Sequence, residues 1–205
     1  MERIRYLLGV FLFILVPLGL VYWLIIHRWA RWWRMWGPIR TCLVVFPVLA
    51  AFGVLLFQVR AQLLGANLGT NWSLIGIALV LLFLTTGLEL QYWRQLSIST
   101  LMGIPELSRQ RKGKLLREGI YGVVRHPRYL SAGIGIVADA LFVNYLGLYI
   151  LLVAVIPPGC WLLVLEEREL LDRFGDAYRE YQRDVPRFIP RRRRVPDQAA
   201  TKLRN

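Results

Sequence analysis

The chain has 205 residues, of which 56% are hydrophobic, yet its formal net charge at pH 7 is +13. A soluble domain of this length does not carry so much apolar sequence, so the apolar residues and the charges must occupy separate segments. Membrane spans joined by basic loops explain the positive charge without nucleic acid, and we expect no nucleic-acid partner. Two histidines predict no metal site, and Cys42 and Cys160 are expected to be small buried hydrophobes.

Three apolar segments in the first half of the chain predict membrane-spanning helices. The first, Tyr6–Ile26, is 21 residues without a charge, and a span needs about 20. A signal peptide has a shorter apolar region and a small-residue cleavage site, whereas this run leads into aromatic and basic residues that are typical of a membrane interface. We therefore expect a retained helix, with His27 at the interface. The second and third spans are predicted at about 41–59 and 72–93.

The apolar stretch from Leu130 to Leu165 is too long for one helix across a membrane. At 1.5 Å per residue it would measure about 54 Å, against a hydrocarbon core of about 30 Å. The segment 144–147, Asn-Tyr-Leu-Gly, is a turn signal. It predicts a short fourth helix at about 130–143 and a fifth at about 147–165, kinked by its double proline.

The C-terminal part predicts an amphipathic helix over about 166–184, lying on the cytoplasmic membrane surface or on the bundle. Its apolar face comprises Leu170, Leu171, Phe174, Tyr178 and Tyr181. Residues 1–190 are expected to form a single domain, and the basic segment 191–205 is expected to be disordered. The sequence thus predicts an all-α integral membrane protein with about five spans.

The positions of the charges test this topology. Five spans place 23 of the 26 Lys and Arg residues on one side of the membrane and leave only Arg3, Arg5 and Arg60 on the other. Positive charge favours the cytoplasmic side, so we expect the N-terminus outside and the C-terminus in the cytoplasm. The short loops favour a prokaryotic plasma membrane as the location.

Two polar clusters flank the predicted hairpin of the fourth and fifth helices. One follows residue 119 and includes Arg125, and the other is the pair Glu166 and Glu167. The hairpin would bring them together at the cytoplasmic face. They could hold a zwitterion such as the amino-acid part of S-adenosylmethionine, with Arg125 on its carboxylate and Glu166 or Glu167 on its ammonium group. The alternative is that these charges are ordinary interface anchors.

Four motifs in the same region resemble the isoprenylcysteine carboxyl methyltransferase family, which is related to membrane phospholipid methyltransferases. They are Gly-Ile-Tyr-Gly-Val-Val-Arg-His-Pro-Arg-Tyr at 119–129, Glu-Glu-Arg-Glu-Leu at 166–170, Phe-Gly-Asp-Ala-Tyr-Arg-Glu-Tyr at 174–181 and Val-Pro-Arg-Phe-Ile-Pro at 185–190. The match covers about a third of the chain, and the first three spans match only in hydrophobicity. Ser131 stands where the family often has glycine.

The resemblance implies a membrane methyltransferase that uses S-adenosylmethionine. By motif, it assigns cofactor binding to Tyr121, Arg125, His126, Pro127, Tyr129, Gly133, Gly135, Glu166 and Glu167. An acceptor that must lose a proton would involve a carboxylate such as Glu89, an ionisable group within a predicted span. We therefore consider Arg125, Glu167 and Glu89 as catalytic candidates.

The acceptor is open at this stage. A lipophilic or lipid-anchored molecule that arrives through the bilayer suits a membrane site, and a prenylcysteine-type carboxylate follows most directly from the resemblance. A phospholipid amine and a small thiol are the alternatives. A non-catalytic membrane scaffold or a small transporter is the alternative of another class, although no inverted repeat favours transport. The sequence does not indicate an oligomeric state.

Overall fold

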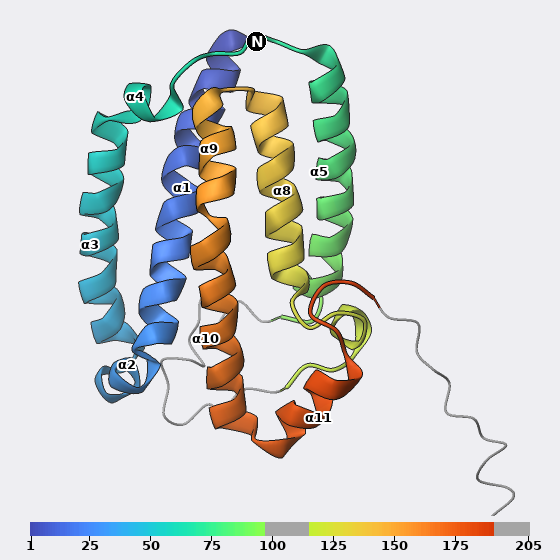
Figure 1. The fold of residues 1–205 in the computed structure, drawn as a ribbon. Coiled ribbons are helices and arrows are strands. Elements are labelled where there is room, and N and C mark those ends of the chain that lie inside the picture. Colours follow the sequence, from blue (N-terminus) through green and yellow to red (C-terminus); the bar gives the residue numbers. More distant parts are fainter. Residues whose placement is uncertain (97–114, 191–205) are drawn as a thin grey trace, which may run out of the picture.

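A computed structural model describes residues 1–96 and 115–190, and within them the protein is all-helical, without a β-strand. The helices are α1 (Glu2–Arg28), α2 (Ala30–Trp36), α3 (Pro38–Gln58), α4 (Arg60–Leu64), α5 (Trp72–Trp93), the 3₁₀ helix η1 (Gly119–Gly122), α8 (Pro127–Val143), α9 (Leu146–Ala154), α10 (Ile156–Phe174) and α11 (Asp176–Asp184) (Figure 1). The predicted basic tail at 191–205 and the basic residues at 109–114 lie outside the described residues.

The protein is an all-α, multi-pass membrane protein. Among the described residues, four helical segments are long and apolar enough to cross a membrane: α1, α3, α5 and the pair α9–α10 taken together. α8, with 17 residues, lies between α5 and the α9–α10 pair (Figure 1). It matches the short fourth helix that the sequence predicts. α1 packs against α3, α8 and α10, while α5 packs along α8.

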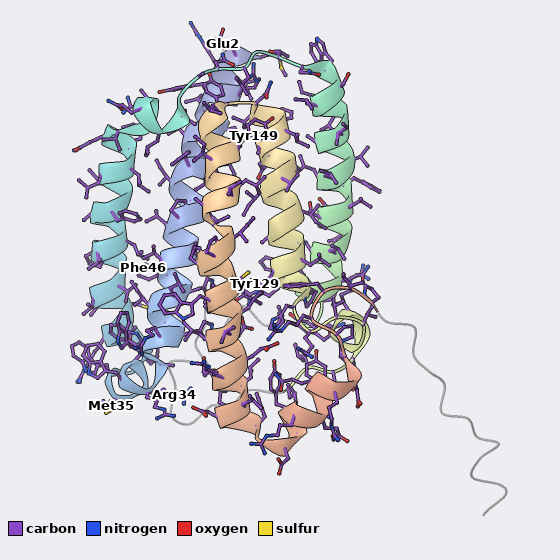
Figure 2. The ribbon with its side chains drawn as sticks, viewed as in Figure 1. Glu2, Arg34, Met35, Phe46, Tyr129 and Tyr149 are labelled. Atoms are coloured by element: carbon purple, nitrogen blue, oxygen red, sulfur yellow. The ribbon has the colours of Figure 1, made fainter. Side chains whose placement is uncertain are left out.

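The two ends of the bundle differ in character. One end, which we call the basic end, holds α2, η1, α11 and the start of α8; the opposite end holds α4 and the turn between α8 and α9 (Figure 1). Figure 2 shows Glu2 and Tyr149 at the opposite end and Arg34 at the basic end. This arrangement follows from the alternating direction of the spans, and it places the arginines of α2 and α11 on one side.

The predicted hairpin turn is confirmed. α8 ends at Val143, and the next residue, Asn144, adopts a left-handed conformation with φ of 51°, which asparagine tolerates better than most residues. The predicted break in the fifth helix is also present. α9 ends before Val155, and Pro157 and Pro158 lie in the first turn of α10 because proline lacks the N–H that a helix interior requires.

The predicted boundary between the last span and the C-terminal helix, at residues 165 and 166, is wrong. α10 continues through the charged residues to Phe174, because glutamate, arginine and leucine are all good helix formers. The helix ends at Gly175, where φ is +56°, and α11 then begins at Asp176. The predicted apolar face is nevertheless real, since its residues pack into one cluster with Val185 and Leu115.

Cys160 corrects a second expectation, because its side chain is exposed and not buried. It lies on α10 within the apolar segment, where lipid takes the place of a protein core. An apolar side chain therefore needs no protein cover at that position.

A buried arginine holds the opposite end together. Arg5 is 1% exposed, and its guanidinium donates hydrogen bonds to the Val143 and Asn144 carbonyls, to Thr70 Oγ1 and to Asn67 Oδ1. These partners come from the end of α8 and from the loop before α5. A single side chain on α1 therefore connects the three segments that meet there.

Candidate active site

The start of α8 is fixed by the segment that follows α11. The backbone N–H of Arg125 donates to the Pro186 carbonyl at 2.8 Å, and that of His126 donates to the Arg187 carbonyl at 3.2 Å. α8 then begins with Pro127, whose missing N–H costs nothing in a first helical turn. The Arg-His-Pro motif and the Val-Pro-Arg motif are thus paired in space, which explains why both belong to one site.

Glu167 is the centre of a buried ion-pair cluster. Its carboxylate is held by Arg125 at 3.0 Å, by the His126 ring at 3.1 Å and by Arg187 at 2.5 Å, and the residue is 5% exposed. Arg125 also donates to the Gln182 and Val185 carbonyls, both at 2.7 Å. Hydrogen bonding to Glu167 raises the pKa of Arg187. Glu167 therefore ties α8, α10 and the segment after α11 to one another.

Glu166 has a different environment from its neighbour. Its side chain accepts a hydrogen bond from the Tyr129 hydroxyl, and it is only half-buried. Figure 2 shows Tyr129 at the level where α8 begins beside α10. A carboxylate with a neutral hydroxyl donor and access to solvent keeps the capacity to bind a cation.

Glu89 lies at the edge of this region. It is exposed, and Ser131 Oγ donates to its carboxylate at 3.2 Å. This hydrogen bond links α8 to the end of α5. Ser131 stands where the family that the motifs resemble often has glycine. Gly133 and Gly135 lie further along α8, and a Cβ atom placed at either would meet nothing within 4 Å.

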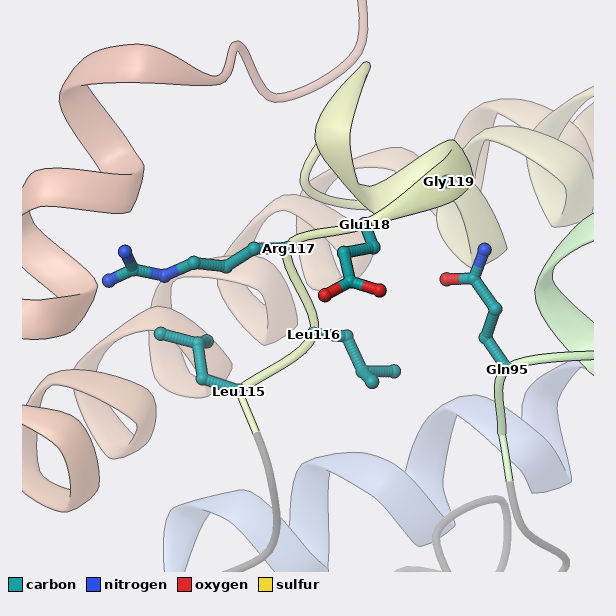
Figure 3. Close-up of a pocket in the computed structure, with 6 residues that line it drawn as sticks. All are labelled: Gln95, Leu115, Leu116, Arg117, Glu118 and Gly119. Carbon is teal, nitrogen blue, oxygen red and sulfur yellow. The ribbon is translucent and has the colours of Figure 1, made fainter.

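A bend at Gly119 positions the segment that leads into α8. Its φ of +56° suits glycine, and a Cβ atom there would overlap the side-chain amide of Gln95. Figure 3 shows Gln95 extending toward Gly119 across a pocket of about 430 Å³. This pocket is lined by Gln95, Leu115, Leu116, Arg117, Glu118 and Gly119. It includes none of the residues predicted to bind the cofactor.

Three tyrosines around the site remain protonated at physiological pH. Burial raises the pKa of Tyr121 and of Tyr178, and it raises the pKa of Tyr181 to about 12. The Tyr181 hydroxyl donates to the Tyr121 carbonyl at 2.7 Å, which joins α11 to η1. These phenols therefore act as packing groups and not as bases, and Tyr181 is also a hydrogen-bond donor.

Two buried donors within the described residues have no hydrogen-bond partner: Arg125 Nε and the Tyr178 hydroxyl. Buried polar groups in proteins are usually satisfied, so an unpaired donor beside a site indicates remaining capacity to bind an acceptor. Arg125 is thus held by Glu167 and by two backbone carbonyls, and its Nε is a buried donor that no described residue satisfies.

The sequence did not reveal a second buried carboxylate. Glu169, 7% exposed, accepts from His27 Nδ1 at 2.7 Å and from Arg34 at 2.7 Å, and Arg173 lies 3.6 Å away. His27, in the last turn of α1, is itself only 8% exposed. Glu169 follows Glu166 by three residues, so both lie on one face of α10, which was the signal that could have found it.

Comparison with known proteins gives a curated relative of this chain. It is Methanethiol S-methyltransferase 1 of Bradyrhizobium diazoefficiens, 37% identical over 83 residues. The similar region is 37% of this chain and 26% of the relative, so the chain spans about a quarter of the length of the curated relative it matches. No protein-family model matches the chain.

Proposed function

We propose that the protein is an S-adenosylmethionine-dependent methyltransferase that methylates a small or lipophilic thiol at the basic end of the bundle. The observation that carries the proposal is the convergence of α8, the acid pair of α10 and the segment after α11 on one polar site. The name of the relative supports both the reaction and a thiol acceptor. A prenylcysteine carboxylate and a phospholipid amine are the alternative acceptors.

The donors and acceptors of the site fit the amino-acid end of the cofactor. Glu166 is half-buried, with the Tyr129 hydroxyl as its hydrogen-bond donor, so its carboxylate suits the ammonium group. Arg125 Nε is an unpaired buried donor and suits the carboxylate. The open space beside Gly133 and Gly135 leaves room next to α8. S-adenosylmethionine, when bound, supplies a methyl group on a sulfonium sulfur that is already activated.

Glu167 and His126 act by positioning in this proposal. Because Arg125, His126 and Arg187 all bind Glu167, that carboxylate has little capacity for a ligand. It instead orients the Arg125 guanidinium, whose Nε is the one nitrogen without an acceptor among the described residues. Glu166 is therefore the residue that binds the ammonium group of the cofactor. The sequence alone leaves that role open between Glu166 and Glu167.

The chain's main contribution to the reaction is alignment. Methyl transfer requires the acceptor atom in line with the methyl group, and holding two reactants in that geometry contributes on the order of 7–11 kcal/mol. A site beside the bilayer admits a lipophilic acceptor sideways and keeps water away. The basic end is the cytoplasmic one in this proposal, which gives the cofactor access from the cytoplasm.

The proposal is tested by titrating S-adenosylmethionine calorimetrically into the full-length protein in detergent. The wild type is expected to bind in the micromolar range, and Glu166→Gln is expected to weaken binding at least tenfold. Asp184→Asn, an exposed carboxylate at the same end, is the matched control and should bind like the wild type.

Absence of binding by a folded wild-type sample would contradict the proposal. A membrane scaffold or a transporter, neither of which needs the cofactor, would then replace it.

A further inference from the structure

Arg128 differs from the other arginines of the site. It is half-buried in the first turn of α8, and no carboxylate in the described residues forms an ion pair with it. Its guanidinium carbon lies 5.3 Å from the centre of the Trp23 ring on α1. By contrast, Arg125 and Arg187 are both bound to Glu167. Arg128 is thus a cation at the site whose charge is not neutralised by an ion pair within the described part of the chain.

The start of α8 adds to this positive potential. First-turn N–H groups have no acceptor within their own helix, and His126 supplies no side-chain cap here. The Arg128 guanidinium, the helix terminus and the Trp23 face together offer a positive group beside an aromatic surface. Such a combination suits a ligand with an anionic head and an apolar body.

We infer that Arg128 binds the methyl acceptor through its nucleophilic atom, and that this atom is anionic when the methyl group is transferred. The inference rests on the proposed function. It makes Arg128 a substrate-binding residue distinct from the Arg125 and Glu166 pair that we assign to the cofactor. A thiolate and a carboxylate are the two anionic acceptors that share this chemistry.

The reaction balances for either acceptor. A thiol first releases its proton to water; the thiolate sulfur then forms a bond to the methyl carbon. The bond from that carbon to the sulfonium sulfur breaks, and its electron pair stays on the departing S-adenosylhomocysteine. A carboxylate reacts in the same way through oxygen and releases no proton, because it is already ionised at neutral pH.

The ionisable groups around Arg128 come from four elements. α1 contributes His27, which stacks on Trp23 with 5.4 Å between ring centres. α5 contributes Tyr92, beside which Glu89 lies, and η1 contributes Tyr121, beside which Glu166 of α10 lies. Burial raises the pKa of Tyr121, and the charge of Arg128 opposes that rise, which places the guanidinium near the phenol. His27 is bound to Glu169.

The test measures methylation rate against pH for the wild type, Arg128→Met, Arg128→Lys and the control Arg168→Met. Arg168 is an exposed arginine at the same end, so its replacement removes an equal charge away from the site. The acceptors are methanethiol and N-acetyl-S-farnesylcysteine. S-adenosylmethionine affinity, measured by calorimetry on each variant, checks that the protein is folded and isolates the acceptor effect.

Arg128→Met is expected to lower kcat/KM for the acceptor by roughly tenfold to a hundredfold, because it removes the charge-assisted hydrogen bond that holds the anionic acceptor. Arg128→Lys should restore part of the loss, and cofactor affinity should stay within about twofold. With a thiol acceptor, the rate rises with pH and the rise moves to higher pH in Arg128→Met. With a carboxylate acceptor, the rate is flat above about pH 6.

Two results would overturn the inference and leave the proposed function standing. One is unchanged turnover in Arg128→Met. The other is a loss of S-adenosylmethionine affinity that accounts for the whole drop in rate, which would assign Arg128 to the cofactor. If the wild type binds no cofactor and methylates neither acceptor, the proposed function itself fails.

Discussion

The adjacent glutamates Glu166 and Glu167 occupy different environments although they are neighbours in sequence. Successive residues on a helix point about 100° apart, so one carboxylate faces the Tyr129 hydroxyl and the other faces three cationic or imidazole groups. A buried carboxylate that is fully paired stabilises structure, whereas a partly exposed one can accept a ligand. The two residues should therefore give different phenotypes when altered.

Replacing Glu167 by glutamine is expected to destabilise the protein. The change leaves Arg125 and Arg187 without their counter-charge, and breaking a buried ion pair at one partner costs on the order of 3 kcal/mol. Thermal unfolding followed by size-exclusion chromatography in detergent measures the effect. Glu166→Gln is the matched comparison, expected to unfold near the wild-type temperature. Equal losses in both variants would contradict the distinction.

The sequence could predict the members of this site but not their pairing. The motifs identify Glu167, Arg125 and His126, and the hairpin turn places them at one end. The role of Arg187 as a partner of Glu167, and the contact between His27 and Glu169 over 142 positions, carry no periodic signal. Such contacts depend on how helices rotate against one another, which apolar patterning constrains only loosely.

At the scale of elements, the close approach of α4 and α9 depends on Gly147. A Cβ atom at this position would overlap the backbone carbonyl of Leu63. A backbone atom cannot move aside as a flexible side chain can. The opposite end of the bundle therefore relies on one glycine for contact and on Arg5 for hydrogen bonding.

Gly147→Ala is expected to separate α4 from α9 and to lower stability by roughly 1–3 kcal/mol, the usual cost of overpacking. Thermal unfolding in detergent is the measurement. Gly76→Ala is the control, because a Cβ atom there meets nothing within 4 Å and alanine favours a helix. If Gly147→Ala were as stable as Gly76→Ala, the close approach would not exist in solution.

Arg5→Met should loosen the same end. It removes hydrogen bonds to two backbone carbonyls and two side chains, at an expected cost of roughly 2–4 kcal/mol. Limited proteolysis should then cleave the loop before α5 more rapidly than in the wild type. S-adenosylmethionine affinity at low temperature should be unchanged, since Arg5 lies at the far end. Arg3→Met, which replaces an exposed arginine in the same turn of α1, should have neither effect.

At the scale of the whole molecule, the lengths of the apolar runs predict the spans well. Span boundaries agree within a few residues for α3 and α5, because polar residues bound those runs on both sides. The predicted helix boundary after residue 165 is wrong because α10 continues beyond the end of the apolar segment to Phe174. The membrane-facing surface explains Cys160 in the same way, since apolar character does not distinguish lipid contact from burial.

The orientation of the bundle gives a separate prediction. In a variant with Cys42 and Cys160 replaced by serine, a new cysteine at Asn71 should react with a membrane-impermeant maleimide in intact cells. A cysteine at Glu180 should react only after the cells are permeabilised. Both positions are exposed, so access depends on the side of the membrane. The reverse pattern of labelling would place the basic end outside.

The decisive experiment on the proposed function asks whether the purified protein transfers a methyl group from S-adenosylmethionine to methanethiol, with dimethyl sulfide measured in the headspace. We expect product at a rate that falls at least tenfold in Glu166→Gln and is unchanged in Asp184→Asn. A folded wild-type protein that binds the cofactor but produces no dimethyl sulfide would contradict a small thiol as the acceptor. A product rate equal in Glu166→Gln and the wild type would contradict the site.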